Sequence, residues 1–312
     1  MENEYTNDNS AGLKVLRLFG ILLILFGIIV VGTFLARLVL SIFIDPSLLD
    51  PDVIVREIED RQYARSLLLL LQGSNTLFTF IILPLLYILF YNKRLKEVLN
   101  FKKPKTGIFI LLSIGIIFSA MPFVGQLVEW NKAIQLPEAL SGLQELFETL
   151  ERKAEEYTKL MVFYDHVYEI IAIVLVIAII PGIGEELLFR GIIQNEIKGI
   201  FSNPHVAIWA TGILFSLIHF QFEGFIPRAA LGALFGYLYY WSGNLLVPIV
   251  IHFLNNAYTF VAMNYMRFQE TEVEASEPTT SPAVTIIFSI ICIMLLIAFH
   301  RLSEHTKNTL YD

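Results

Sequence analysis

The sequence predicts an all-α membrane protein: a polytopic helix bundle of about eight transmembrane helices that encloses a buried polar chamber. Hydrophobic residues make up 55% of the chain, and the mean hydropathy is +0.63. Charged residues make up 16%, whereas soluble domains average about 25%. Apolar runs recur at the length of about 20 residues that a bilayer requires. Helices satisfy their backbone hydrogen bonds internally, as lipid demands, and the alternating pattern of a membrane barrel is absent.

The predicted spans follow one another along the chain without a separate soluble domain. Their approximate bounds are 14–44, 66–91, 107–130, 165–199, 204–222, 227–242, 244–263 and 283–300. The fourth span is longer than a bilayer requires. We therefore expect residues 1–312 to form a single membrane domain.

Residues 137–161 predict a helix of a different kind. Apolar side chains recur there at spacings of three and four residues, and Glu and Lys fill the opposite face. The apolar positions are Leu140, Leu143, Phe147, Leu150, Ala154, Tyr157 and Met161. The pattern is typical of an amphipathic helix that begins near Pro137. We expect this loop helix to cap the bundle or to lie on the outer membrane surface, and we prefer packing against the bundle.

Charged loops predict how the chain is oriented. Six basic residues fall in the short connection 92–106, and such density is typical of a cytoplasmic loop. They are Lys93, Arg94, Lys96, Lys102, Lys103 and Lys105. Counting outward from this loop places both termini inside and the acidic loops 45–65 and 269–277 outside. We expect an integral, multi-pass protein of a bacterial cytoplasmic membrane.

Net charge argues against nucleic acid as a partner, and the cysteine content excludes a disulfide within the chain. The net charge is −7 at pH 7 and no long basic run occurs, so nucleic acid is not an expected partner. The single cysteine, Cys292, has no partner for a disulfide within the chain and is expected to be a small buried apolar residue. The lipid bilayer is the partner that composition implies, and the sequence leaves the oligomeric state open.

Polar side chains inside apolar helices are the strongest functional signal. Such groups are costly in lipid and usually face an interior cavity. Glu186 and Arg190 are four residues apart and share a helix face, which predicts a structural ion pair. Glu185 points about 100° away and has no cation on its own helix, so it is the stronger catalytic candidate. A helix break at Pro181-Gly182 is expected to open space beside it.

Two further pairs of side chains lie on later spans. Phe215 and His219 share a face of the fifth span. His252 and Asn256 share a face of the seventh span, whereas Asn255 is expected to point elsewhere. All three motifs fall within a predicted catalytic core of about residues 165–263.

The depth of these residues decides whether they can meet. Glu185 and His219 each lie 17 residues from Ser202, where the turn between two spans is expected. At about 1.5 Å per residue both reach roughly 25 Å from that turn. His252 lies only roughly 13 Å beyond the next turn by the same rise. The levels agree if the hairpin 191–203 projects beyond the bilayer, and convergence is expected on that condition.

Two chemistries use this set of side chains. In the first, Glu185 and His219 hold and deprotonate a water molecule while His252 and Asn256 donate to the oxyanion that forms. In the second, His219, His252 and Glu185 bind Zn²⁺ and leave one position open for water. The sequence lacks a local His-Glu-x-x-His helix, which modestly favours the metal-free route. The expected cofactor is therefore none or zinc.

The ordered motifs on successive helices resemble the CPBP family of intramembrane proteases. The motifs are Glu185-Glu186-x-x-x-Arg190, Phe215-x-x-x-His219 and His252-x-x-x-Asn256. The family includes CAAX prenyl endopeptidases and bacterial Abi-type proteins, and its members are described both as metalloproteases and as glutamate-dependent enzymes. The resemblance implies a membrane-embedded chamber in which Glu185 and His219 activate water. It also implies His252 and Asn256 as oxyanion donors.

The sequence thus predicts an intramembrane endopeptidase that cleaves a membrane-associated protein or peptide near the cytoplasmic half of the bilayer. CAAX-type processing and bacteriocin-related maturation or immunity are both compatible with the resemblance. A transporter or proton-coupled carrier is the main alternative, because it too would place Glu, Arg and His inside the bundle. A non-catalytic membrane immunity or scaffold protein is the third. The substrate, its prenylation and the pathway are not predicted.

Overall fold

The structure is a computed structural model that describes residues 11–92, 98–99, 101, 104–270 and 281–308. Within these ranges the chain is helical and contains no strand. The all-α membrane bundle predicted from composition is therefore confirmed. All but one of the six basic residues of the 92–106 connection, and most of the acidic loop 269–277, lie outside the described residues.

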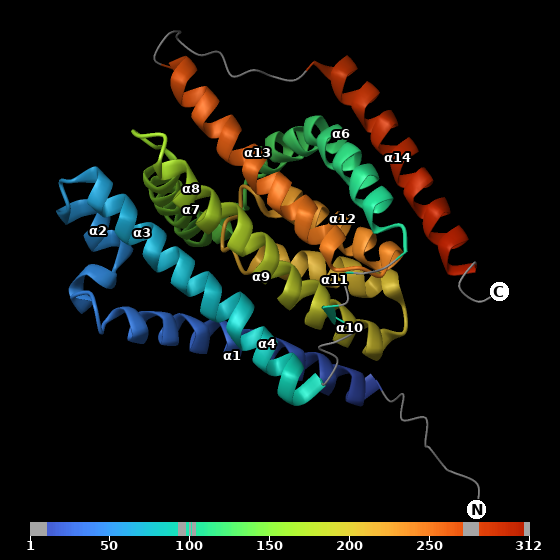
Figure 1. Ribbon diagram of the computed structural model, residues 1–312. Coiled ribbons are helices and arrows are strands. Elements are labelled where there is room, and N and C mark those ends of the chain that lie inside the picture. Colours follow the sequence, from blue (N-terminus) through green and yellow to red (C-terminus); the bar gives the residue numbers. More distant parts are fainter. Residues whose placement is uncertain (1–10, 93–97, 100, 102–103, 271–280, 309–312) are drawn as a thin grey trace, which may run out of the picture.

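Figure 1 shows the order and arrangement of the helices. Their bounds are α1 (Ala11–Leu40), α2 (Pro51–Glu57), α3 (Arg61–Thr76), α4 (Leu83–Tyr87), α6 (Thr106–Lys132), α7 (Ser141–Val162), α8 (Glu169–Val174), α9 (Ile180–Leu188), α10 (Gln194–Phe201), α11 (Pro204–Leu217), α12 (Phe225–Ser242), α13 (Leu246–Glu270) and α14 (Pro282–Asn308). Helices α1, α3 and α4 form one flank, α6 and α14 the other, and α8 to α13 lie between them (Figure 1).

Six helices in the described part of the chain are long and apolar enough to cross a membrane. They are Gly12–Leu40, Arg61–Tyr91, Thr106–Lys132, Glu169–Phe201, Leu246–Phe268 and Pro282–Thr306. The other two predicted spans are shorter: α11 has 14 residues and α12 has 18, and α12 carries a charged residue near its start. The polytopic bundle is as predicted, with six helices of spanning length in the described residues and the shorter hairpin α11–α12 at the places of the other two predicted spans.

The long helix Glu169–Phe201 is continuous, so the predicted break at Pro181-Gly182 is wrong. A π-helical turn at Leu175–Ile179 directly precedes α9, and this turn accommodates Pro181 within the continuous helix. Gly182 still brings α9 close to α13, because a Cβ there would lie 3.1 Å from the backbone nitrogen of Phe253. Close approach of the two helices, rather than a break, places the fourth span beside the seventh.

Helices α11 and α12 pack backbone to backbone. A Cβ at Gly212 would lie 2.8 Å from the carbonyl oxygen of Ala229, and a Cβ at Gly232 would lie 2.9 Å from the Cα of Gly212. Gly236 faces another element, since a Cβ there would lie 2.7 Å from the side-chain oxygen of Gln194 on α10. Any larger residue at Gly212 or Gly232 would separate the hairpin that positions the fifth-span motif.

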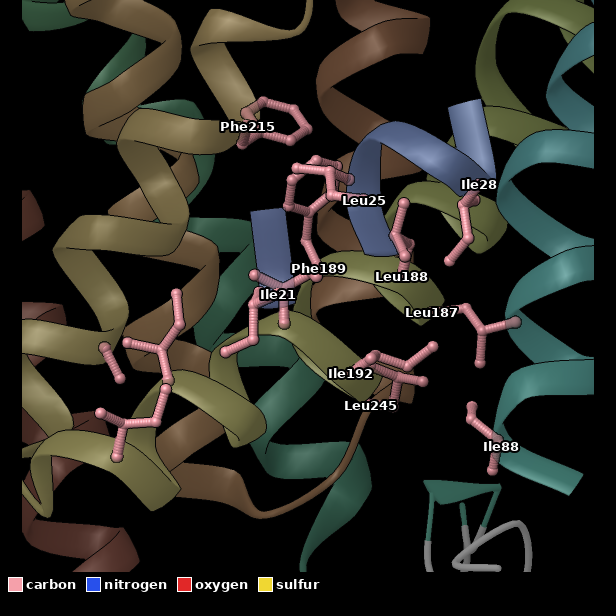
Figure 2. Close-up of a cluster of buried hydrophobic side chains, with 14 residues drawn as sticks. Ile21, Leu25, Ile28, Ile88, Leu187, Leu188, Phe189, Ile192, Phe215 and Leu245 are labelled. Carbon is pink, nitrogen blue, oxygen red and sulfur yellow. The ribbon is translucent and has the colours of Figure 1, made fainter. Parts of the chain in front are cut away.

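A buried apolar cluster fixes the helix that carries the first motif. Figure 2 shows this cluster, in which side chains from α1, α9 and α11 meet. Phe189 lies in the π-helical turn that follows α9 (Phe189–Ile193) and packs edge-on against Phe215, with ring centroids 5.2 Å apart. The helix that carries Glu185 is thereby held in the core.

The amphipathic sequence at residues 137–161 forms α7, which packs against the bundle. Its Phe147 ring stacks on Phe222 in the α11–α12 connection, with centroids 5.3 Å apart. Lys153 and Tyr157 both bond the carboxylate of Asp52 in α2. Because α11 and α12 are short, α7 covers the end of the hairpin that faces it.

Side-chain bonds at the two ends of α6 show which connections share an end of the bundle. At the first end, the Asn244 amide donates to the Thr106 hydroxyl and to the Phe101 carbonyl, each over 2.9 Å, so the turn before α13 lies beside the start of α6. At the second end, the Asn131 amide donates to the Phe222 carbonyl over 2.7 Å. Since Phe222 contacts α7, α7 and the 92–106 connection lie at opposite ends of the bundle.

Candidate active site

One cavity of about 510 Å³ contains the predicted catalytic residues. Glu185 reaches it from α9, His219 from the end of α11, and His252 and Asn256 from α13. Phe215 also lines the cavity, whereas Glu186 and Arg190 lie behind it with no exposed side-chain surface. The three motifs, separate in sequence, therefore meet at one place.

Glu185 occupies the middle of the longest apolar helix, Glu169–Phe201. Its side chain is 13% exposed, while that of Glu186 is 0% exposed. No Lys or Arg in the described residues lies within ion-pair distance of Glu185; its one charged-group contact is the His252 Nε2 atom, 3.7 Å from Oε2. A carboxylate that borders a cavity without a Lys or Arg partner is suited to accept a proton from water.

His219 follows the C-terminal end of α11. Its Nδ1 lies 2.8 Å from the carbonyl oxygen of Phe215, so the neutral ring donates from Nδ1 and keeps the lone pair on Nε2. Phe215 packs against both histidines of the site, with ring centroids 5.1 Å from His219 and 5.8 Å from His252. Phe215 thus separates and orients the two imidazoles.

Arg190 is bound at three points. Its Nη1 donates to Glu186 Oε1 over 2.7 Å, and its Nη2 donates to the Gly232 carbonyl over 2.6 Å. The guanidinium also lies over the rings of Phe215 and Phe235, 5.3 and 5.6 Å from their centroids. The ion pair that the spacing predicts is present. Through its bond to Gly232, Arg190 also links the π-helical turn after α9 to α12.

Glu186 has a second partner that sequence reasoning missed. Its Oε1 lies 2.7 Å from the Nδ1 of His252. Since an ionised carboxylate only accepts, His252 donates from Nδ1, and its Nε2 faces Glu185. No signal along the chain marks this contact, because it joins residues 66 positions apart on different helices. Glu186 therefore orients His252 in addition to pairing with Arg190.

The prediction that Asn255 points away from the site is wrong. Both Asn255 and Asn256 line the cavity, and the Asn255 amide donates to Asn256 Oδ1 over 3.3 Å. Beside α13 the cavity is wide enough that two neighbouring positions of this helix border it. With its oxygen occupied, Asn256 keeps its amide N–H groups for another acceptor.

Sequence reasoning also missed Arg228, Tyr157 and Gln72, which line the same cavity. Arg228 could have been predicted from the sequence, because an arginine within an apolar predicted span already indicates a polar interior. Tyr157 belongs to the apolar stripe of α7, so the loop helix forms part of the cavity wall.

The described residues contain no group of three or more His, Cys, Asp or Glu side chains arranged to hold a metal ion. Of the three ligands that the zinc alternative requires, Glu185 and His252 are close together, and His219 completes no such group with them.

Together these features define an integral membrane protein with a carboxylate–histidine site enclosed by its helices. Residues 168–258 match the family model described as "Type II CAAX prenyl endopeptidase Rce1-like". The matched segment includes every motif residue of the cavity. Over residues 168–258 the chain is thus similar to CAAX-type intramembrane proteases, in agreement with the resemblance seen in the sequence.

Two curated relatives match parts of the chain. The chain is 30% identical over 113 residues to the membrane-embedded CAAX protease MroQ of Staphylococcus aureus strain USA300, covering 34% of this chain and 43% of that protein. It is 31% identical over 88 residues to the uncharacterized protein YpbD of Bacillus subtilis strain 168, covering 27% of this chain and 42% of that protein. The chain thus matches less than half the length of either relative. No solved structure matches it.

Proposed function

We propose that this chain is an intramembrane endopeptidase that hydrolyses a peptide bond of a membrane-associated protein or peptide. The observation that carries this proposal is the cavity where Glu185, without a paired Lys or Arg, faces the same space as His219, whose Nε2 lone pair is free to accept. The match of this segment to the CAAX protease family supports the same reaction class.

In the proposed reaction, a water molecule between Glu185 and His219 loses a proton to Glu185 as its oxygen attacks the peptide carbonyl. The oxyanion that forms accepts hydrogen bonds from the Asn256 amide and from His252 Nε2. That second bond uses a hydrogen on His252 Nε2, in addition to the Nδ1 hydrogen that the Glu186 carboxylate accepts. Glu185 then returns its proton to the leaving amine nitrogen, and the peptide C–N bond breaks.

Asn256 and Asn255 provide a graded test of the oxyanion assignment. We expect Asn256→Ala to slow hydrolysis roughly 10²–10³-fold, because one donor to the oxyanion is removed. We expect Asn255→Ala to cause a smaller loss, since it removes only the bond that orients Asn256. The turnover number of each purified variant, at matched thermal stability, is the measurement. Equal losses for the two variants would contradict the assignment.

We further propose that water activation here does not depend on a bound metal. The proposal is supported by the donor arrangement, because His219 forms no three-ligand group with Glu185 and His252 in the described residues. We expect purified protein to retain hydrolysis after treatment with EDTA and 1,10-phenanthroline, measured on the same peptide before and after. A loss that added Zn²⁺ restores would overturn the metal-free route.

The position of the cavity conflicts with one sequence prediction. Residues 154–162 of α7 line the cavity, and α7 lies at the end of the bundle opposite to the 92–106 connection. If that basic connection is cytoplasmic, the cavity opens toward the outer half of the membrane rather than the cytoplasmic half. We propose the outer orientation, because a concentration of Lys and Arg in a short loop sets topology. A cysteine placed at exposed Gly142 of α7 would then react with a membrane-impermeant maleimide from outside intact cells.

The experiment that tests hydrolysis in cells compares membrane peptides from cells that express the wild-type chain or Glu185→Gln at equal levels. We expect a set of new peptide termini only with the wild-type chain, and these termini would also reveal the substrate class. Identical peptide sets from the two strains would contradict proteolysis of a substrate available in that host.

A further inference from the structure

Arg228 is a cation in the wall of the cavity, without a carboxylate partner. It is the one Lys or Arg among the described residues that line this cavity. Its Nη1 donates to the Gln221 side-chain oxygen over 3.0 Å, and its Nη2 donates to the Gln221 carbonyl over 2.5 Å. Both acceptors are uncharged. Its Nε is buried and has no hydrogen-bond partner.

Arg190 provides the internal comparison. Its charge is satisfied by Glu186 at 2.7 Å, whereas none of the ion pairs within 4.0 Å in the described residues includes Arg228. A partly buried cation left without a counter-ion is costly, so an anionic ligand in the cavity would recover part of that cost. A guanidinium is suited to this task, because its parallel N–H groups match the two oxygens of a carboxylate.

Glu151 on α7 is the acid whose charge acts on Arg228, yet none of the ion pairs in the described residues joins the two. The Oε2 atom of Glu151 is buried without a hydrogen-bond partner. Burial raises the pKa of the Glu151 carboxyl, although the positive charge of Arg228 acts in the opposite direction. Glu151 therefore compensates Arg228 incompletely and leaves the guanidinium available to a ligand.

The local backbone is shaped to hold the guanidinium. A Cβ at Gly224 would lie 2.5 Å from Nη1 of Arg228 and 2.7 Å from its Cζ. Gly224 has φ −104°, a value that any residue adopts, so the backbone does not require glycine there. The missing side chain instead leaves room for the guanidinium of Arg228. Gln221 and Gly224 thus keep the charged group at one place in the cavity wall.

We propose that Arg228 binds a carboxylate of the substrate and thereby selects peptides that carry one at a fixed distance from the scissile bond. This inference rests on the proposed function, because it describes the substrate of the same cavity. The carboxylate is either the chain terminus or an Asp or Glu side chain of the peptide. Arg228 is a specificity residue in this account, and Glu185 and His219 remain the catalytic pair.

The test measures binding separately from hydrolysis. The Glu185→Gln chain in nanodiscs of zwitterionic lipid is titrated with an N-terminally labelled apolar octapeptide in three forms. One form has a free carboxyl terminus, one is the terminal amide, and the third is a set of amides with a single Glu at each position in turn. We expect one carboxylate form to bind about 10- to 100-fold more tightly than the uncharged amide.

Three further substitutions, each made in the Glu185→Gln chain, assign that preference. Arg228→Gln is expected to abolish it, Arg228→Lys to retain part of it, and Gly224→Ala to weaken it while the charge is kept. A preference for the free acid identifies the chain terminus as ligand, and a preference for one Glu position identifies a side chain. No preference for any carboxylate form, or a preference that survives Arg228→Gln with unchanged thermal stability, would overturn the proposal.

Failure of the proposed function has a different signature. The same peptides are given to the chain that retains Glu185, and their cleavage is followed. Carboxylate-dependent binding without any cleavage would contradict the endopeptidase and leave the Arg228 site intact. Cleavage that falls equally for acidic and neutral peptides in the Arg228→Gln variant would show that Arg228 acts on the fold or on His219 instead.

Discussion

Replacing Glu185 with Gln is expected to lower peptide hydrolysis by about 10²–10⁴-fold while the protein still folds. The amide keeps the volume of the side chain but does not accept a proton from water. Because the Glu185 side chain borders the cavity and forms no ion pair with Arg or Lys in the described residues, its loss leaves no cation unpaired. Turnover of the purified variant and its thermal midpoint in detergent are the measurements.

Glu196→Gln is the matched control, since Glu196 lies on the same continuous helix but does not line this cavity. We expect Glu196→Gln to retain the wild-type turnover. Activity in the Glu185→Gln protein close to that of the control would rule out Glu185 as the base.

Replacing Arg190 with Ala is expected to destabilise the fold by about 3–5 kcal/mol, because it leaves a buried carboxylate without its cation. Glu186 and Arg190 are both 0% exposed, and Arg190 also bonds the Gly232 carbonyl. Unfolding in a mixed-micelle SDS titration measures the loss. Arg17→Ala, at an exposed position of α1, is the control and is expected to change the unfolding free energy little.

A second substitution separates the charge effect from the loss of packing. Adding Glu186→Gln to Arg190→Ala removes the uncompensated charge, and we expect part of the stability to return. Wild-type stability of the single Arg190→Ala variant would contradict the structural role of the pair. Equal stability of the single and double variants would show that packing, rather than charge, accounts for the loss.

Much of this site could be predicted because helical spacing is a local property. Residues four apart share a face whatever surrounds them, so the Glu186–Arg190 contact and the shared face of His252 and Asn256 follow from the chain itself. The meeting of Glu185 with His219 also follows from equal distances to the turn at Ser202, where the structure places the end of α10 in a left-handed conformation.

The missed features depend on contacts between helices or on local backbone adjustments. The Glu186–His252 bond joins two helices, and its existence depends on how α9 and α13 rotate against each other. Pro181 does not break its helix, because a π-helical turn accommodates the proline, and spacing does not predict such a turn. Asn255 reaches the cavity because the cavity is wider than one helix face. The shortness of α11 and α12, and hence the cover by α7, became clear only in three dimensions.

Alternative functions make different predictions for the same residues. A proton-coupled carrier would use Glu185 to move protons without cleaving a peptide, and a scaffold or immunity protein would tolerate its loss. The buried pair Glu186–Arg190 serves any of these proteins, since it stabilises the bundle. The proposed hydrolysis in particular uses the Glu185 carboxylate, which lines one cavity with His219 and two asparagines.

The most direct test of the central claim uses purified protein in liposomes with a library of peptides from digested membrane proteins. New amino termini and the pH inside the vesicles are followed together for the wild-type, Glu185→Gln and Glu196→Gln chains. We expect a common set of cleavages with the wild-type and Glu196→Gln chains, and none with Glu185→Gln. Proton flux that depends on Glu185 in the absence of any cleaved peptide would contradict an intramembrane protease and identify a carrier instead.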